Sequence, residues 1–118
     1  MTPTSEDPSC IFCRIAAGEV PADVVARTER VVAFRDLDPQ APLHVLVVPV
    51  AHHRDVPSLA AADPSLLAEV AETAGRVAAE LGEGQFRLVF NTGERAGQSV
   101  FHVHGHVLAG RPLAWPPG

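Results

Sequence analysis

Apolar and polar positions divide the chain into short strand-like segments and one long helical segment. Val31–Asp36 is rich in β-branched and aromatic residues, and Phe86–Asn91 alternates with period two, so both are predicted strands. His44–Pro49 is a near-continuous apolar run, which is typical of a central strand covered on both faces. Val24–Arg27 fits a further short strand. These segments predict an antiparallel sheet.

Helix signals stand at two places. Asp63 before Pro64 gives a helix N-cap followed by proline at the first helical position, and Gly82 fits just beyond the end. Cys10–Gly18 predicts one or two helical turns. Residues 50–62 are interpreted as a connection. The long helix carries its apolar residues at helical spacing, at Leu66, Leu67, Val70, Ala74, Val77, Ala78 and Leu81.

The whole pattern predicts one α+β domain over residues 1–118. It consists of an antiparallel sheet of about five strands with one long and one short helix. Residues 1–8 are expected to be a loose terminus, and residues 111–118, with three prolines, an irregular tail.

Composition narrows the possible partners. The chain has 118 residues and a net charge of −5, without a basic run, so we expect no binding to nucleic acid. No apolar run approaches the roughly 18 residues needed to span a membrane, and residues 1–9 lack a signal-peptide pattern. We therefore expect a cytoplasmic protein without membrane contact, whose two cysteines do not form a structural disulfide.

Three histidines alternate along Phe101–Leu108. In a strand, His102, His104 and His106 would share one face, with neighbouring rings roughly 7 Å apart. Such a row can hold a metal, bind an anion or supply a nucleophile with supporting groups. Single buried histidines are common in cores, but an alternating triplet is difficult to explain by packing alone.

Residues around the triplet favour an anion site. His44 can join the row if its strand is a neighbour in the sheet. A glycine-containing loop precedes the triplet, and such loops can turn their N–H groups inward around phosphate. A neutral imidazole beside phosphate is suited to attack on phosphorus, with water then clearing the phosphohistidine. The candidate anion-binding residues are Asn91, Gly97, Gln98 and Ser99.

The segment His102–Leu108 resembles the histidine-triad signature of the HIT superfamily. Further stretches resemble its Hint branch, the purine nucleoside phosphoramidases, and together they extend from about residue 10 to the end. Gly-Gln-Ser before the triplet and Trp-Pro-Pro-Gly after it make the resemblance specific. The similar stretches are Cys10–Phe12, Phe34–Pro42, His44–Pro49, Gly97–Phe101 and Trp115–Gly118.

This resemblance implies a role for each matching residue. His104 matches the nucleophile that attacks the α-phosphorus of a nucleotide, while His106 and His44 match the histidines that support it. The implied reaction is hydrolysis of AMP or GMP joined through a P–N or similar bond, in a homodimer without an organic cofactor. The implied contacts are Asn91 and Ser99 for phosphate and leaving group, Asp36 for ribose, Ile11, Phe12, Phe34 and Leu37 for the purine, and Trp115 for the partner's site.

Gly105 departs from the family pattern, which usually has a bulky apolar residue there. Glycine in a strand weakens it and often marks the close approach of another group. Either the site is looser, or another group fills the space.

The pair Cys10-x-x-Cys13 has two interpretations. The two thiols can simply lie on a short helix. Alternatively they bind zinc, because related bacterial proteins and galactose-1-phosphate uridylyltransferases use such a pair with two histidines. Cys10, Cys13, His52 and His102 would match that structural zinc site, and His53 is a possible substitute for His52.

Three other functions remain open from the sequence. The first is a dinucleoside polyphosphate hydrolase of the same superfamily, against which the C-terminal Trp-Pro-Pro-Gly argues. The second is a non-catalytic purine-nucleotide-binding adaptor that uses the same pocket. The third is a protein in which the histidine triplet itself chelates a metal.

Overall fold

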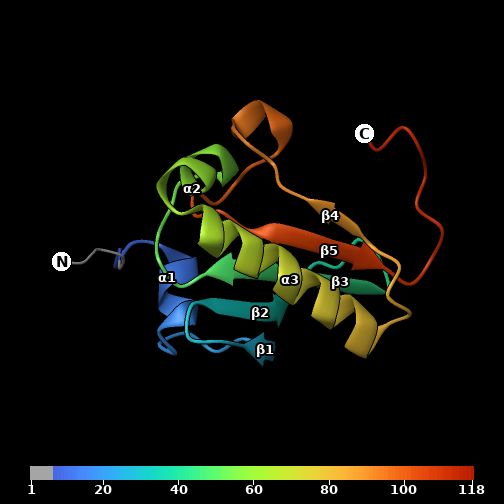
Figure 1. Cartoon of the computed structure of the whole chain (residues 1–118), viewed down its shortest axis with the longest axis horizontal. Coiled ribbons are helices and arrows are strands. Elements are labelled where there is room, and N and C mark those ends of the chain that lie inside the picture. Colours follow the sequence, from blue (N-terminus) through green and yellow to red (C-terminus); the bar gives the residue numbers. More distant parts are fainter. Residues whose placement is uncertain (1–6) are drawn as a thin grey trace.

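Five antiparallel strands form a single sheet in the order β1-β2-β3-β5-β4 (Figure 1). The computed structural model describes residues 7–118, so the terminus expected to be loose lies mostly outside the described residues. The prediction of an α+β domain with an antiparallel sheet of about five strands is confirmed. The strands are β1 (Val24–Arg27), β2 (Val31–Arg35), β3 (Leu43–Pro49), β4 (Arg87–Val89) and β5 (Gly105–Ala109).

Strand β3 lies in the middle of the sheet, and all seven of its residues are buried. Its odd-numbered members Leu43, Val45 and Val47 belong to the core beneath the long helix. Leu46 and Val48 belong to a second core on the opposite face. The continuous apolar run in the sequence therefore has a simple cause, because each face of this strand is covered by a different layer.

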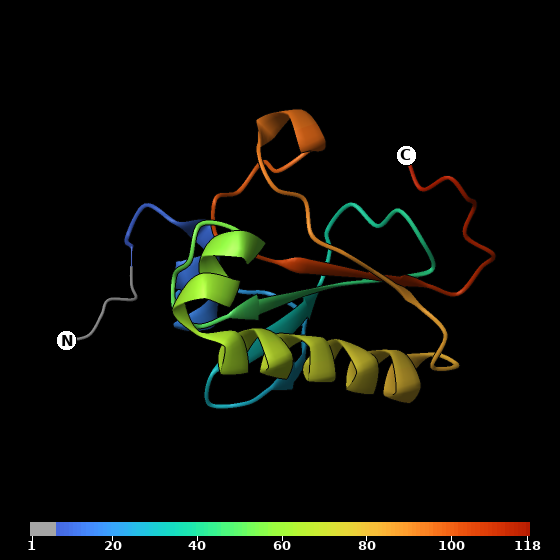
Figure 2. The same cartoon turned by 45° about the horizontal axis from the view of Figure 1, so that its top comes forward.

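Helix α3 (Pro64–Leu81) covers one face of the sheet, as Figures 1 and 2 show. The side chain of Asp63 accepts a hydrogen bond from the backbone N–H of Leu66 at 3.1 Å, which is the predicted N-cap. Helix α1 (Ile11–Ala16) lies on the other face, where Phe12 and Ile15 share a core with Phe34.

A second short helix, α2 (Val56–Ala62), lies within the segment interpreted as a connection. Asp55 caps it by accepting a hydrogen bond from the N–H of Ser58, and Pro57 stands in the first turn. Leu59 is its one buried residue. Because only one of its residues is buried, this helix lacks the repeated apolar spacing that predicts a helix from sequence.

The histidine segment enters the sheet later than predicted, because β5 begins at Gly105 and residues 101–104 lie before it. The backbone N–H of Val103 nevertheless donates to the carbonyl of His53, at 2.7 Å. Val103 and Val107 both belong to the core under α3. The predicted alternation of side chains between the two faces is thus kept.

The space beside Gly105 is filled. A Cβ at this position would meet Leu88 Cδ1 at 2.9 Å and Phe90 Cζ at 3.0 Å. Of the two explanations for the missing side chain, the structure supports a space occupied by other groups. Within residues 7–118, no helix is both long and apolar enough to cross a membrane.

Candidate functional site

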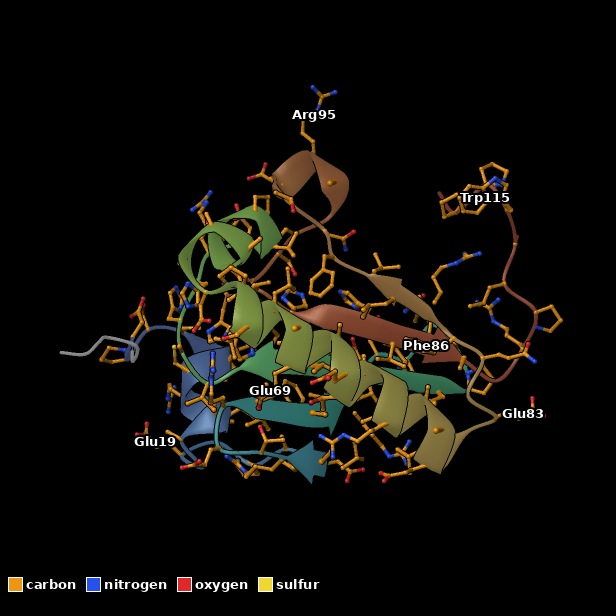
Figure 3. The ribbon with its side chains drawn as sticks, viewed as in Figure 1. Glu19, Glu69, Glu83, Phe86, Arg95 and Trp115 are labelled. Atoms are coloured by element: carbon orange, nitrogen blue, oxygen red, sulfur yellow. The ribbon has the colours of Figure 1, made fainter. Side chains whose placement is uncertain are left out.

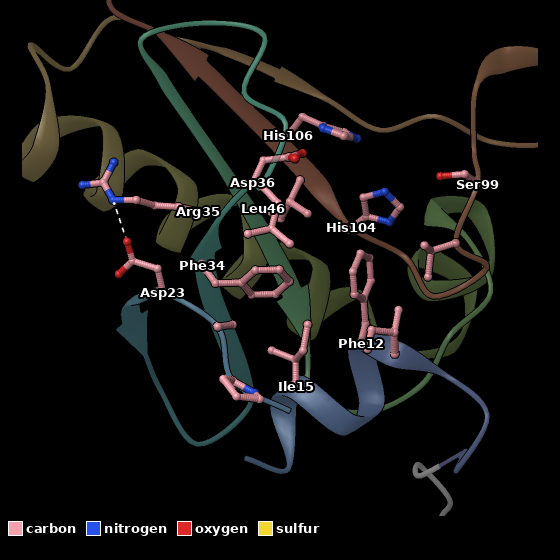
Figure 4. Close-up of a pocket in the computed structure, with 15 residues that line it drawn as sticks. Phe12, Ile15, Asp23, Phe34, Arg35, Asp36, Leu46, Ser99, His104 and His106 are labelled. Atoms are coloured by element: carbon pink, nitrogen blue, oxygen red, sulfur yellow. Dashed lines mark ion pairs between the residues drawn. The ribbon is translucent and has the colours of Figure 1, made fainter. Parts of the chain in front are cut away.

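A cavity of about 290 Å³ opens on the face of the sheet that α1 partly covers (Figure 4). Its volume is near the lower end of the range for small-molecule pockets, roughly 300–1,000 Å³. Apolar residues form most of its wall, and a group of polar residues, Asp36, Ser99, His104 and His106, lies together at one end. The lining residues predicted from the sequence are Ile11, Phe12, Phe34, Asp36, Leu37, Ser99, His104 and His106.

The imidazole of His104 is held in one tautomer. Its Nδ1 lies 2.8 Å from the carbonyl oxygen of His102. A carbonyl only accepts hydrogen bonds, so Nδ1 carries the proton and Nε2 keeps its lone pair. The ring of Phe12 packs edge-on against this imidazole at 5.0 Å between centroids. His104 thus stands in the cavity wall with a basic nitrogen and little rotational freedom.

His44 and His106 form a hydrogen-bonded chain. The backbone N–H of Gln40 donates to His44 Nδ1 at 3.0 Å, so the proton of neutral His44 must be on Nε2. That Nε2 lies 3.0 Å from Nδ1 of His106 and donates to it. His106 is therefore protonated at Nε2 and presents an N–H donor. As the sequence predicts, His44 joins the row, and neighbouring β3 and β5 bring it there.

Burial favours the neutral form of His104 and His106. It lowers the pKa of His104 below the ordinary value of 6.5. It also lowers the pKa of His106, to about 4, with a further contribution from the neighbouring His104 and His44. The two rings are 5.0 Å apart between centroids, closer than the roughly 7 Å expected for an ideal strand. At neutral pH the pair offers one nucleophile and one hydrogen-bond donor.

Asp36 and Ser99 stand on either side of this pair. Oδ2 of Asp36 lies 3.4 Å from His44 Nε2, and its Oδ1 accepts a hydrogen bond from the N–H of Asp38. The side chain of Ser99 points toward the cavity beside His104 (Figure 4). A carboxylate, which can accept hydrogen bonds from hydroxyl groups, and a hydroxyl, which can donate to an anion, are thus both present at this end of the cavity.

Four predicted nucleotide contacts, Asn91, Gly97, Gln98 and Trp115, do not form part of the cavity wall. The buried Gln98 amide instead organises its own loop, since it accepts from Gly93 N–H and donates to the carbonyls of Arg54 and Val100. Gly97 has φ +104°, a left-handed conformation that favours glycine.

Trp115 lies on the C-terminal tail, at the opposite side of the molecule from α1 (Figures 1 and 3). Its side chain is 81% exposed, and the guanidinium of Arg87 lies 6.0 Å from its ring centroid. Within one chain the tryptophan thus does not line the cavity, and its predicted place is at the partner's site.

Several lining residues are missing from the sequence prediction. Leu46 follows His44 by two positions on the same strand face, and Ile15 follows Ile11 by one helical turn, so periodicity could have found both. Nothing in the sequence marks Asp23 and Arg35 as residues that line the cavity. The additional lining residues are Ile15, Pro21, Ala22, Asp23, Arg35, Leu46 and Val100.

Beside the cavity, the ligand atoms of Cys10, Cys13, His52 and His102 all lie within 4.8 Å of one another. Sulfur–nitrogen distances are 3.3 to 3.5 Å, and the two Nδ1 atoms are 3.2 Å apart. A tetrahedral zinc site with ordinary bond lengths requires separations of about 3.3 to 3.8 Å between its ligands. The donor set and its spacing therefore fit zinc.

Hydrogen bonds orient this cluster for a metal. His102 donates from Nε2 to the carbonyl of Pro49 at 2.8 Å, which leaves its Nδ1 lone pair for the cluster. Burial lowers the pKa of His102 to about 4 and raises the pKa of the Cys13 thiol to about 11. Of the two adjacent candidates, His52 enters the cluster, whereas His53 contributes its carbonyl to the N–H of Val103.

Known proteins are similar to this chain in sequence and in fold. An uncharacterized HIT-like protein of Synechocystis sp. is 48% identical over 112 residues, which cover 92% of this chain and 96% of the relative. The crystal structure of a HIT family hydrolase from Legionella pneumophila superposes with a TM-score of 0.88 at 44% identity, covering 93% of this chain and all of that one. A zinc-bound histidine triad family protein from Mycobacterium smegmatis has a TM-score of 0.76 and 32% identity, covering 87% and 76%.

The family model described as HIT domain matches residues 17–113, which include the cavity wall from Pro21 onward and all the histidines. The match spans most of the chain, and the similarity to the HIT family hydrolase extends over nearly all of it. This chain belongs to the HIT family.

Proposed function

We propose that the protein hydrolyses purine nucleoside 5′-phosphoramidates through a nucleotidyl-histidine intermediate. The observation that carries the proposal is the hydrogen bond from His104 Nδ1 to the carbonyl of His102. It leaves the Nε2 lone pair available in a cavity whose polar end can receive phosphate and whose apolar walls can receive a base. The similarity to a HIT family hydrolase supports hydrolysis as the reaction class.

Each step makes and breaks one bond to phosphorus. His104 Nε2 attacks the α-phosphorus, the P–N bond breaks, and the leaving amine gains a proton from water. A water molecule then attacks the same phosphorus, the bond to His104 breaks, and the attacking water loses a proton, so the proton count balances. The Nε2–H of His106 can donate to a phosphoryl oxygen as charge develops there.

Trapping the intermediate tests this proposal. Rapid quenching of the protein with adenosine 5′-phosphoramidate should give a nucleotidylated peptide that contains His104. A protein that cleaves diadenosine polyphosphate but not the phosphoramidate would instead be a dinucleoside polyphosphate hydrolase. Binding of AMP without cleavage of either compound would identify an adaptor.

A structural zinc ion is part of this proposal. Cys10, Cys13, His52 and His102 would hold it, and zinc bound there would tie α1 and the segment after β3 to the histidine segment. The zinc-bound family member from Mycobacterium smegmatis supports the assignment. Metal analysis of protein purified without a histidine tag should give about one equivalent, and less than about half an equivalent would contradict it.

We also propose that the chain acts as a homodimer. The exposed Trp115 would then be covered by the second copy, as the resemblance implies. The molar mass in solution, measured by light scattering, should be twice that of the chain.

A further inference from the structure

We propose that Arg111, on the C-terminal tail, is a positioning residue that holds His44 in place through the backbone of Gln40. This inference rests on the proposed function, since His44 supports the groups assigned to chemistry there. Nη2 of Arg111 donates to the carbonyl oxygen of Gln40 at 2.9 Å, and the backbone N–H of the same Gln40 donates to His44 Nδ1 at 3.0 Å. Arg111 does not line the cavity, so it would act through Gln40.

The bond from Gln40 fixes the first ring in the chain of histidines. Nε2 of His44 lies 3.0 Å from Nδ1 of His106 and 3.4 Å from Oδ2 of Asp36, so two acceptors stand beside its one proton. Because Gln40 holds the opposite side of the ring, Nε2–H stays directed at His106. Displacing Gln40 would therefore free the His44 ring and weaken the bond that orients His106.

The loop that carries Gln40 has little packing of its own. It joins β2 to β3, and residues 37–40 are all exposed. Two of the hydrogen bonds of this stretch are local, from Asp38 N–H to the Asp36 carboxylate and from the Gln40 side chain to the Asp38 carbonyl. Among the described residues, Arg111 is the only one beyond β3 whose side chain hydrogen-bonds to this stretch. The position of the Gln40 backbone therefore depends on Arg111.

Gly110 brings Arg111 close to this loop. Gly110 directly follows β5 and has φ +97°, a left-handed conformation that favours glycine. A Cβ there would meet Pro42 Cβ at 2.8 Å and the backbone nitrogen of Leu43 at 3.4 Å. Leu43 pairs with Ala109 where β3 and β5 are neighbours. The tail thus begins directly against the loop, and Figure 2 shows both on the same side of the molecule.

Hydrogen exchange of the Gln40 amide in Arg111→Ala tests the contact in the protein without ligand. NMR should show this amide exchanging at least about tenfold faster in the variant than in the unaltered protein, because its bond to His44 opens more often. Arg111→Lys keeps one donor for the Gln40 carbonyl and should restore part of the protection.

Kinetics with adenosine phosphoramidate test the consequence for the reaction. We expect kcat of Arg111→Ala to fall by about tenfold and KM to change by less than about threefold, since a supporting group is displaced and no substrate contact is removed. Arg111→Lys should recover part of kcat. Arg76→Ala is the control, because it also removes an exposed arginine, on α3 and thus on the other face of the sheet. Both alanine variants should melt within a few degrees of the unaltered protein.

Three results would overturn the inference. Unchanged exchange of the Gln40 amide in Arg111→Ala would show that the guanidinium does not hold this backbone. Faster exchange with unchanged kcat would show that holding it does not serve the reaction. An equal fall of kcat in Arg76→Ala would assign the effect to lost charge. If the unaltered protein cleaved no phosphoramidate, the proposed function itself would fail, whereas the exchange of the Gln40 amide would still decide whether Arg111 holds the loop.

Discussion

The carbonyl of His102 accepts the hydrogen bond of His104, while the ring of the same His102 faces Cys10 and Cys13. One residue therefore connects the proposed metal cluster with the proposed nucleophile. Its backbone selects the tautomer of the nucleophile, and its side chain is anchored on the far side by Pro49. Anything that displaces His102 should disturb the chemistry two residues away.

Replacing the nucleophile should remove activity and leave the fold intact. His104→Ala deletes the only ring nitrogen whose free lone pair we assign to attack, so we expect turnover of adenosine phosphoramidate to fall by at least about a thousandfold. Steady-state kinetics and circular dichroism measure the two effects. His53→Ala is the control, because only the backbone of His53 is used. Activity above a few per cent in His104→Ala would reject the assignment.

Metal removal should weaken both stability and turnover. Cys13→Ser breaks the four-ligand set, so we expect less than half an equivalent of zinc, a melting temperature lower by several degrees and slower turnover. Elemental analysis, thermal melting and kinetics follow these effects. His104→Ala should keep its zinc, whereas loss of zinc from that variant would show that the histidine triplet itself is the chelator.

Gly105 should be intolerant of large side chains. Gly105→Leu would compete with Leu88 and Phe90 for the same space, so we expect a loss of about 1–3 kcal/mol in the free energy of unfolding. Phe90→Ala should recover part of that loss when combined with Gly105→Leu. Urea denaturation of the two single variants and the double variant measures the coupling. Simple addition of the two penalties would contradict a shared space.

Acid should destabilise the protein partly through His106. Its pKa is lowered to about 4 in the folded state, against 6.5 ordinarily, so the unfolded chain binds more protons between these values. The contribution of His106 is therefore complete above pH 6.5 and declines as the pH falls toward 4. Urea midpoints at pH 7, 6 and 5 should decline less in His106→Gln than in the unaltered protein. Parallel slopes in both proteins would exclude this contribution.

Gln98 should act through its loop. Gln98→Ala leaves Gly93 N–H and two carbonyls without their side-chain partner, which we expect to cost about 1–3 kcal/mol in stability. Because Ser99 is the next residue, kcat should also fall. Thermal melting and kinetics measure both effects. The exposed Gln85→Ala should change neither by much, and unchanged stability in Gln98→Ala would assign this amide to the ligand instead.

Periodicity and capping predicted most of the fold. The continuous run of β3 and the N-cap at Asp63 each have one physical explanation, and both stand where expected. Helix α2 was not predicted because a single buried leucine does not create the apolar spacing of a helix. The start of β5 was misplaced because Val103 still faces the core under α3, as a strand residue would, although residues 102–104 lie outside the sheet.

The candidate site was predictable where a strand or motif fixed it. His44, His104 and His106 come together because β3 and β5 are neighbours. Gln98 could not be placed, since only the folded loop shows which polar atoms its amide satisfies. Asp23 lies far from the histidines in the sequence, and the β1–β2 pairing alone brings it to the cavity beside Arg35.

Residues of β3 belong to both hydrophobic cores, one under α3 and one under α1. Separating either helix from the sheet would therefore expose this strand to water. Amide protons of Val45 to Val48 should then exchange with deuterium only when the whole molecule unfolds, whereas those of the edge strand β4 should exchange earlier. His44 directly precedes that slowest segment on the same strand, and His106 pairs with Leu46 within it. Two of the histidines assigned to chemistry thus stand on or beside the part of the molecule that opens last.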